Sequence, residues 1–302
     1  MPEQPLRWGA EALWEQLAPQ LPGLSVEVVA RISSTNSALL ERARIVVPPS
    51  EEGAELAQVR RSVESTAFGR RAADLQPCLL VAEHQTHGRG RQGRLWQAAP
   101  GASLTFSLAL PLTPKDWAGL SLAVGVALAD ALDAAPADAP PAIGVKWPND
   151  LWLMDARGGG RKLGGILIET VAAGARRLAV IGIGLNVRPM SPGDTSSGYA
   201  CLQEIDPHAT APQVLGRIAK PLVDGVRRFE CEGFAAFAAS FARRDLLRGR
   251  LVHTTHQDVP EGRAEGLSAE GALLVRLADG RVAELSSGEV SVRLQPAAGG
   301  GA

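Results

Sequence analysis

The feature that most constrains the fold is the recurrence of short apolar runs of strand length, separated by polar or glycine-rich connections. Such runs occupy residues 24–32, 45–47, 79–82, 104–110, 144–147, 151–154, 163–171 and 178–187. Helical spacing of apolar residues appears in the first twenty residues, after residue 36, at 117–132 and at 211–247. The 117–132 segment is apolar nearly all round, so we expect it to be a helix buried against a sheet.

The C-terminal part of the sequence differs in the spacing of its turn residues. Glu261-Gly262, Glu270-Gly271 and Asp279-Gly280 divide residues 248–294 into short runs, which is the turn spacing of a small β-barrel. Residues 50–76 are charged with weak helical spacing, so we predict a surface insertion there. We therefore divide the chain into a main domain at 1–247, a small domain at 248–295 and a disordered tail at 296–302.

Composition limits the function classes. The 302 residues carry 31 Lys and Arg against 32 Asp and Glu, a formal net charge of -1, so no global basic field is available to hold DNA or an anionic membrane. Three well-separated cysteines form neither a disulfide framework nor a CxxC site, and we expect buried thiols in a reducing cytoplasm. The N-terminus has no secretory pattern, and the most apolar stretch, 120–132, is too short to span a bilayer.

Residues 85–96 (QTHGRGRQGRLW) concentrate glycine and arginine. Their GxGxxG spacing formally fits a dinucleotide site, but no helix follows to hold a pyrophosphate, because Pro100-Gly101 ends the segment. A loop whose backbone can approach an anion, with three guanidinium groups, is better suited to a phosphate or an acyl phosphate. A solvated basic loop is the alternative.

Three further segments have ligand-binding features. KWPND, residues 146–150, places an aromatic wall, an amide and a carboxylate at a strand end, although Asp150 and Lys146 could form only a surface ion pair. In RKLGG, residues 161–165, the paired glycines let a ligand lie against the strand backbone, the alternative being a β-bulge with a surface lysine. IGIGLN, residues 181–186, again combines an apolar strand with glycines and a terminal polar group.

Metal, hydrolase and P-loop sites are not indicated. His84 and His87, like His253 and His256, lie three residues apart without a third ligand at a metal-like spacing, so no protein metal site is predicted. The GxSxG and GxxxxGK[ST] motifs are absent from the sequence.

In this order, SSTN (33–36), QxxGRGRxGRxW (85–96), KWPND, KLGGILIE (162–169) and GIGLNV (182–187) resemble the biotin protein ligase family over roughly residues 24–294. The resemblance implies an α+β fold, a mixed β-sheet packed on helices, shared with lipoate ligases and followed by a small SH3-like β-barrel. Regulatory members add a winged helix for DNA. We expect none here, because only about 33 residues precede the SSTN motif.

The resemblance also implies an ATP-dependent, AMP-forming ligase, with Mg²⁺, that makes biotinyl-5'-adenylate and then biotinylates a carrier lysine. The catalytic residues implied are Lys162, Arg89, Arg91 and Asp150, with Asp150 as the base for the carrier lysine. The biotin-binding residues implied are Ser34, Thr35, Asn36, Gln85, Gly88, Arg89, Arg91, Trp147, Lys162, Gly164 and Gly165. The ATP-binding residues implied are Arg91, Arg94, Trp96, Lys146, Asn149, Asn186 and Arg293.

The implied partners are biotin, ATP and the biotin carboxyl carrier domain of a carboxylase, with neither specific DNA nor a membrane; a homodimer is left open. Two alternatives are a lipoate or related acyl ligase, which would share the sheet, and a non-catalytic biotin-binding effector. A sequence that lacked Lys162 or the loop arginines would be typical of the non-catalytic effector. Since these residues are present, the enzyme is favoured.

Overall fold

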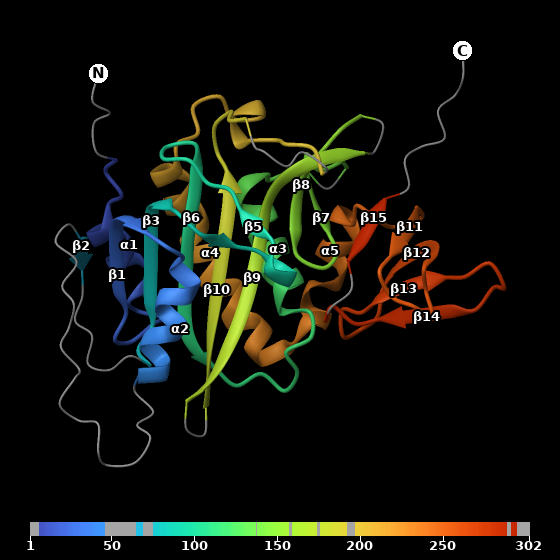
Figure 1. Ribbon diagram of the computed structural model, residues 1–302, viewed down its shortest axis with the longest axis horizontal. Coiled ribbons are helices and arrows are strands. Elements are labelled where there is room, and N and C mark those ends of the chain that lie inside the picture. The colour runs from blue at the N-terminus through green and yellow to red at the C-terminus, as the bar shows by residue number, and fades with distance from the viewer. Residues whose placement is uncertain are drawn as a thin grey trace. The chain divides into compact units, whose positions relative to one another are not determined.

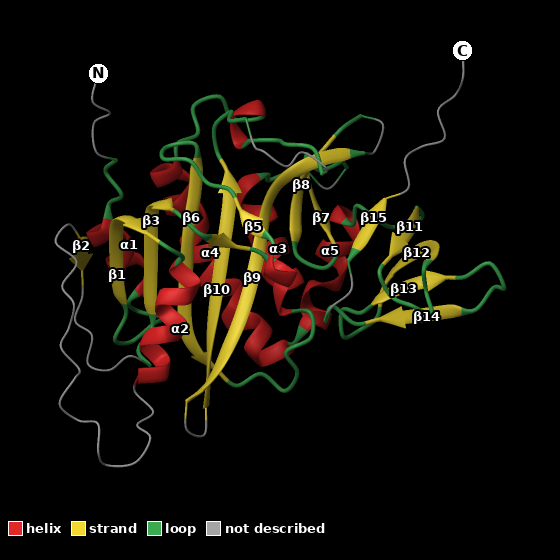
Figure 2. Cartoon of the chain, in the orientation of Figure 1, coloured by secondary structure: helices red, strands yellow, loops and turns green. Residues whose placement is uncertain are grey.

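The computed structural model describes residues 6–45, 65–68, 75–136, 138–156, 159–173, 176–191, 197–288 and 291–294 (Figures 1 and 2). The chain divides into two compact units. The first comprises Met1–Thr113 and Leu163–Val223, and the second Pro114–Lys162 and Asp224–Ala302. Within the described part of the chain, no helix is both long and apolar enough to cross a membrane.

The first unit is built on a mixed sheet. Its strands lie in the order β2 (Ser65–Phe68), β1 (Ser25–Ile32), β3 (Cys78–Gln85), β6 (Ser103–Leu112), β10 (Arg176–Asn186) and β9 (Gly160–Ala173). Strands β1 and β3 are parallel, and the other pairings among these strands are antiparallel. The first three residues of β9, up to Lys162, belong to the second unit.

Helix α2 (Thr35–Ile45) covers one face of this sheet (Figure 1). Its Leu39, Leu40 and Ala43 pack on a buried cluster that includes Cys78 and Val180. Full burial of each leucine side chain is worth about 1.5–3 kcal/mol, so the helix is held mainly by its apolar side. Helix α1 (Ala10–Leu17) packs on β1 and β2.

The second unit combines helices with two groups of strands. Helix α3 (Leu120–Leu132) is buried along most of its length against the hairpin of β7 (Ile143–Lys146) and β8 (Asp150–Met154), and also contacts η3 (Phe234–Phe237) and α5 (Ala238–Arg244). Helix α4 (Ala211–Glu232) starts in the first unit and ends in the second.

The C-terminal strands form an antiparallel sheet. Its order is β14 (Val282–Leu285), β13 (Leu273–Arg276), β12 (Glu261–Leu267), β11 (Leu251–Thr254) and β15 (Val292–Leu294). The turns at Gly271 and Gly280 have φ of 89° and 86°, a left-handed conformation that glycine adopts without steric cost. Two of the turn pairs identified in the sequence, Glu270-Gly271 and Asp279-Gly280, therefore separate strands, whereas Glu261-Gly262 lies at the start of β12 and is not a turn.

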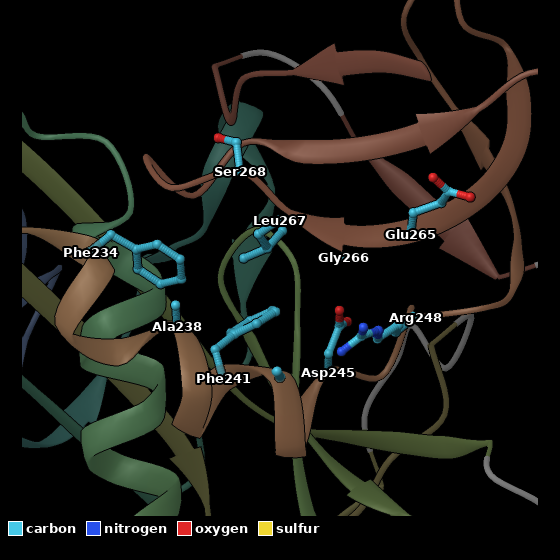
Figure 3. A pocket seen from close by; sticks show the side chains of 10 residues that line it. Phe234, Ala238, Phe241, Asp245, Arg248, Glu265, Gly266, Leu267 and Ser268 are labelled. Atoms are coloured by element: carbon cyan, nitrogen blue, oxygen red, sulfur yellow. The ribbon is translucent and has the colours of Figure 1, made fainter. Parts of the chain in front are cut away.

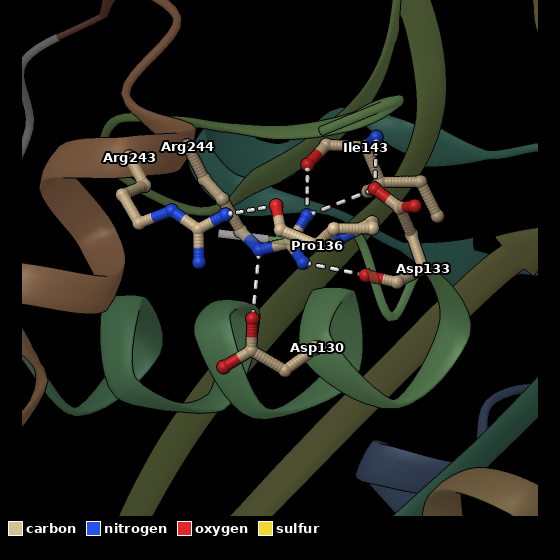
Figure 4. Close-up of polar contacts among 6 residues, drawn as sticks. All are labelled: Asp130, Asp133, Pro136, Ile143, Arg243 and Arg244. Atoms are coloured by element: carbon tan, nitrogen blue, oxygen red, sulfur yellow. Dashed lines mark hydrogen bonds and ion pairs between the residues drawn. The ribbon is translucent and has the colours of Figure 1, made fainter. Parts of the chain in front are cut away.

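Arg244 joins the elements that precede the KWPND turn (Figure 4). Its buried guanidinium donates to Oδ1 of Asp130 at 2.8 Å, to Oδ2 of Asp133 at 3.0 Å and to the carbonyl oxygen of Ile143 at 2.8 Å. Asp130 and Asp133 come from α3 and its C-terminal end, and Ile143 begins β7. One side chain thus ties α5 to the helix and the strand that lead into residues 146–150.

The predicted fold class, an α+β mixed sheet with a small C-terminal β-domain, is confirmed. Two local predictions were wrong. Ile45 ends α2 and does not begin a strand, and β6 continues through Pro111. Ser65–Phe68, within the segment predicted as a surface insertion, forms an edge strand. Cys231 is exposed, although buried thiols were expected. The predicted tail, 296–302, lies outside the described residues.

Candidate active site

Ser34, Thr35 and Asn36 of the SSTN motif lie at the start of α2 and form a buried polar cluster in the first unit. The backbone N–H of Thr35 donates to Oε1 of Gln85 at 2.7 Å, and its hydroxyl lies 3.1 Å from the same oxygen. Ser34 Oγ accepts a 3.4 Å hydrogen bond from Ser37 N–H, as N-terminal helix residues do. The packing of β1 beside β3, with Ile32 opposite Gln85, brings these distant segments together.

Ser107 completes this cluster. Its hydroxyl lies 2.6 Å from the hydroxyl of Thr35 and donates to Oδ1 of Asn36, also at 2.6 Å. All three side chains are almost fully buried. The cluster therefore presents neutral donors and acceptors in fixed positions, which suits recognition of an uncharged polar group.

Beside the cluster, the same face of the sheet is lined by small residues. Gly165 on β9 lies opposite Gly184 on β10, which lies opposite Thr105 on β6. A Cβ at Gly184 would come within 2.4 Å of the indole ring of Trp96, and one at Gly182 within 2.2 Å of Oδ1 of Asn36. The glycines are thus required because Trp96 and Asn36 lie directly on the strand backbone.

Trp96 reaches that position from the glycine-arginine loop, which we define as residues 88–96. The loop is a short ribbon in which β4 (Gly88–Arg89) pairs with β5 (Leu95–Trp96) around η1 (Arg91–Gly93). Gln92 and Gly93 have φ of 55° and 71°, so the tip is left-handed. Leu95 is 75% exposed.

Arg89 is held by Glu169. Its Nη2 lies 3.0 Å from Oε1 of Glu169, and its Nη1 donates to Oε2 at 3.2 Å, a two-point ion pair. Oε2 also accepts a 3.0 Å hydrogen bond from Nδ2 of Asn36. One carboxylate thereby joins the glycine-arginine loop to the polar cluster.

In the second unit, KWPND forms the turn between β7 and β8. Asp150 pairs with Lys162, with Nζ 2.8 Å from Oδ1, and the side chains are 17% and 29% exposed. The ion pair considered from sequence between Asp150 and Lys146 is therefore replaced by one with Lys162. A cation and a carboxylate in contact at a partly exposed position can be separated by an incoming anion or amine.

Lys146 and Trp147 connect this turn to the C-terminal sheet. Lys146 Nζ donates to the carbonyl oxygen of Val292 at 2.8 Å and lies 5.1 Å from the ring centre of Trp152. Trp147 is 1% exposed, and its indole N–H donates to the carbonyl oxygen of Gly271 at 3.1 Å. Both side chains therefore support the position of the turn.

The other sequence-predicted residues lie in varied settings. Asn186 is buried, and its amide donates to the carbonyl oxygen of Ala200 at 2.9 Å. Asn149 is half-buried beside Asp150. Arg293 is exposed on β15, opposite His253 of β11. In the loop, Arg91 is half-buried, Arg94 is exposed and Gly88 is buried.

Sequence reasoning missed Ser107 and Glu169. Ser103, Thr105 and Ser107 alternate with apolar residues in β6, which already indicated a polar stripe on one strand face. Glu169 follows the apolar run GILI and shares its strand face with Gly165 and Leu167. Its partners could not be identified without the sheet register.

A pocket in the second unit is lined by none of the sequence-predicted site residues (Figure 3). Phe234 and Phe241, in an edge-to-face pair with ring centres 6.0 Å apart, form one wall, and Leu267 of β12 forms another. Asp245 also lines it; its Oδ2 is buried and, within the described residues, has no hydrogen-bond partner. Burial raises the pKa of the Asp245 carboxyl above its usual value.

Comparison with known proteins adds independent findings. The sequence model of the biotin/lipoate A/B protein ligase family matches residues 63–186, and that of the biotin protein ligase C-terminal domain matches residues 251–293.

Two curated relatives resemble the chain over most of its length. The bifunctional ligase/repressor BirA of Escherichia coli is 32% identical over 92% of this chain and 77% of the relative. The biotin--[acetyl-CoA-carboxylase] ligase of Mycobacterium tuberculosis is 33% identical over 93% of this chain and 91% of the relative.

Among solved structures, a mutant of the Aquifex aeolicus biotin protein ligase, in complex with biotin, is similar with a TM-score of 0.64. It is 25% identical and is matched over 89% of this chain and 97% of that chain.

Proposed function

The chain belongs to the biotin protein ligase family, and from that premise we propose that it attaches biotin to one lysine of a biotin carboxyl carrier domain, using ATP. The observation that carries the proposal is the 33% identity to a ligase of this class over nearly the whole chain. In the first step the biotin carboxylate attacks the α-phosphate of ATP, giving biotinyl-5'-adenylate and pyrophosphate. In the second, the carrier lysine attacks the mixed anhydride and releases AMP.

The polar cluster of the first unit is proposed to bind the ureido ring of biotin. That ring is neutral and offers both donors and acceptors, so hydroxyls and amides match it without the desolvation that a charged partner would require. Ser34, Thr35, Asn36 and Gln85 supply such groups. Gly88, Gly164 and Gly165 are assigned to the apolar tail because a backbone without side chains permits close approach.

Lys162 is proposed to bind the biotin carboxylate and then the adenylate phosphate. The first step brings two anions together, and a fixed ammonium group offsets their repulsion. Its ion pair with Asp150 pre-positions the ammonium group. When Lys162 turns to the ligand, the Asp150 carboxylate becomes available to take a proton from the carrier lysine, which must be neutral to attack.

The nucleotide is assigned to Arg91, Arg94, Trp96, Asn149 and Asn186, with Arg293 on the C-terminal domain as a further candidate. Guanidinium groups suit phosphates and a flat indole suits a base. Trp147 and Lys146, proposed from sequence as direct contacts with biotin and ATP, are better explained as supports of the KWPND turn. Their polar groups are already bonded to the C-terminal sheet.

Mg²⁺ is proposed as the partner of the ATP phosphates. Mg²⁺ takes oxygen ligands, commonly one or two carboxylates together with substrate phosphates. The side-chain oxygens of Asn149 and Asp150 at the turn are of this type. Bound there, the ion would neutralise phosphate charge during attack.

The experiment is a pyrophosphate-exchange assay with ATP, Mg²⁺ and either biotin or lipoate, followed by transfer of labelled biotin to an apo carrier domain. Biotin-dependent exchange and label on the carrier are expected. Exchange with lipoate alone would favour the lipoate ligase, and biotin binding without exchange would favour a non-catalytic effector.

We propose no repressor role, because the net charge near zero provides no general attraction for DNA. A gel shift at low salt that retained a specific fragment would contradict this. The cytoplasm is the proposed compartment, since carboxylase carrier domains and ATP occur there.

A further inference from the structure

We propose that Glu169 is a positioning residue of the ligase, which fixes the glycine-arginine loop by holding Arg89. The inference rests on the proposed function in that it concerns a loop assigned to ligand binding. The sequence and the family motifs assign no role to Glu169, and they predict that Arg89 itself contacts ligands.

The geometry is that of an anchor. Arg89 lies on β4, the first strand of the loop, and Glu169 lies in β9 of the sheet. Both Nη atoms of Arg89 face the carboxylate, at 3.0 Å and 3.2 Å, and Nη1 also reaches Oγ of Ser37 on α2 at 3.4 Å. A planar guanidinium held at two points cannot rotate freely, so the backbone of β4 is fixed with it.

The same carboxylate is part of the polar cluster. Oε2 accepts from Nδ2 of Asn36, whose Oδ1 accepts from Ser107. Asn36 Nδ2 also donates to the carbonyl oxygen of Leu167 at 3.1 Å, which fixes the amide orientation. The loop is thus tied to the groups assigned to the ureido ring through a single side chain.

Charge explains why Arg89 serves as the anchor. Its cation is already offset by Glu169, so it attracts an anionic ligand less than an uncompensated arginine does. The side chains of Arg89 and Glu169 are 45% and 24% exposed, and a pair so exposed contributes little to global stability. Removing it should therefore loosen the loop without unfolding the protein.

The test uses Glu169→Ala, Arg89→Ala and the double variant in the full chain. Glu169→Gln serves as a milder change that keeps the hydrogen-bonding oxygen. Asp206→Ala is the matched control, because it removes another partly exposed ion pair of the first unit, with Arg217. Two quantities are measured: the rate of tryptic cleavage after Arg91 and Arg94 without ligand, and KM for biotin against kcat in pyrophosphate exchange.

Either single alanine variant should speed cleavage in the loop and raise KM for biotin by roughly three- to tenfold, the cost of ordering a freed side chain and its loop on binding. The maximal rate should change less. The double variant should lose little more than Glu169→Ala alone, because the main contact of Arg89 is with Glu169, whereas Glu169 also accepts from Asn36. Glu169→Gln should fall between wild type and Glu169→Ala, and Asp206→Ala should behave as wild type.

Wild-type cleavage in both Glu169 variants would overturn the inference. So would a much larger loss in Arg89→Ala than in Glu169→Ala, since Arg89 would then contact the ligand directly, or additive losses in the double variant. A wild-type protein without biotin-dependent exchange would instead refute the proposed function, and the cleavage rates would still decide the anchor.

Discussion

The ammonium group of Lys146 donates a hydrogen bond to the carbonyl oxygen of Val292, 146 positions further along the chain. Together with the bond from Trp147 to Gly271, it makes the C-terminal sheet a support for the KWPND turn. The small domain is therefore tied to the turn that carries Asp150.

Trp147→Phe tests this support. The change removes the indole N–H and leaves the carbonyl oxygen of Gly271 buried without its donor, which should cost about 1–3 kcal/mol of stability. Trp14→Phe is the control, because Trp14 also donates to a backbone carbonyl, that of Leu24, at 3.0 Å. Both variants should lose stability in thermal unfolding, Trp14→Phe less because its hydrogen bond is only partly buried, whereas only Trp147→Phe should lower adenylation. Equal adenylation activity in the two variants would contradict a catalytic role for the hydrogen bond from Trp147 to Gly271.

Substitutions of Lys162 and Asp150 should affect different steps of the reaction. Lys162→Ala should lower adenylate formation by two or more orders of magnitude, since an electrostatic stabiliser is commonly worth ~3 kcal/mol. Asp150→Asn keeps a polar side chain but loses the base, so it should lower transfer to the carrier more than adenylation. Single-turnover assays of each step measure this. Unchanged adenylate synthesis in Lys162→Ala would remove the lysine from the site.

Arg91→Ala should weaken retention of the adenylate. We propose that the loop carrying Arg91 also shields the reactive anhydride from water. We expect faster release of the intermediate, seen as label on lysines of a bystander protein added to the reaction. A leakage rate equal to that of wild type would show that Arg91 has no shielding role.

Sequence predicted the strands well because apolar runs and turn residues are local signals. It also predicted Thr35 and Gln85 as partners of one ligand, and they do lie in contact. What it could not supply depends on sheet register: the pairing of Glu169 with Arg89, or the position of Asn36 over Gly182. The burial of Trp147 was missed for a similar reason, since its hydrogen-bond acceptor belongs to the C-terminal sheet.

Arg244 should be a large contributor to stability. Arg244 is 5% exposed, and its guanidinium neutralises Asp133, whose side chain is itself mostly buried. Arg244→Ala would leave the Asp133 carboxylate without its cation and the carbonyl oxygen of Ile143 without its donor. Breaking a buried ion pair in this way should lower the free energy of unfolding by about 3–5 kcal/mol. Urea unfolding measures it, with Arg228→Ala as control, because the pair of Arg228 and Glu232 is about half exposed. A loss in Arg244→Ala no greater than that in the control would contradict the assignment.

Asp245 should make stability depend on pH in the opposite sense to most carboxylates. Burial raises the pKa of its carboxyl in the folded protein, so the folded protein holds the proton more tightly than the unfolded chain. Below the usual pKa of 3.8 both states are protonated and burial of the group carries no ionisation penalty. Above that pH the unfolded chain releases this proton first, so stability is lost as pH rises until it has passed through the raised folded pKa.

Asp245→Asn removes that titration while its side-chain oxygen can still accept from the N–H of Leu247, as Oδ1 does at 2.9 Å. The Tm of the variant minus that of wild type should therefore increase between about pH 3.5 and about pH 8. Asp279→Asn is a control of opposite sign, because hydrogen bonds from Arg281 lower the pKa of Asp279. There the wild type gains stability as pH rises from the lowered folded pKa to the usual 3.8, so the difference should become more negative only in this acid range and stay constant above it. A Tm difference for Asp245→Asn that is independent of pH would show that the carboxylate is not desolvated in the folded protein.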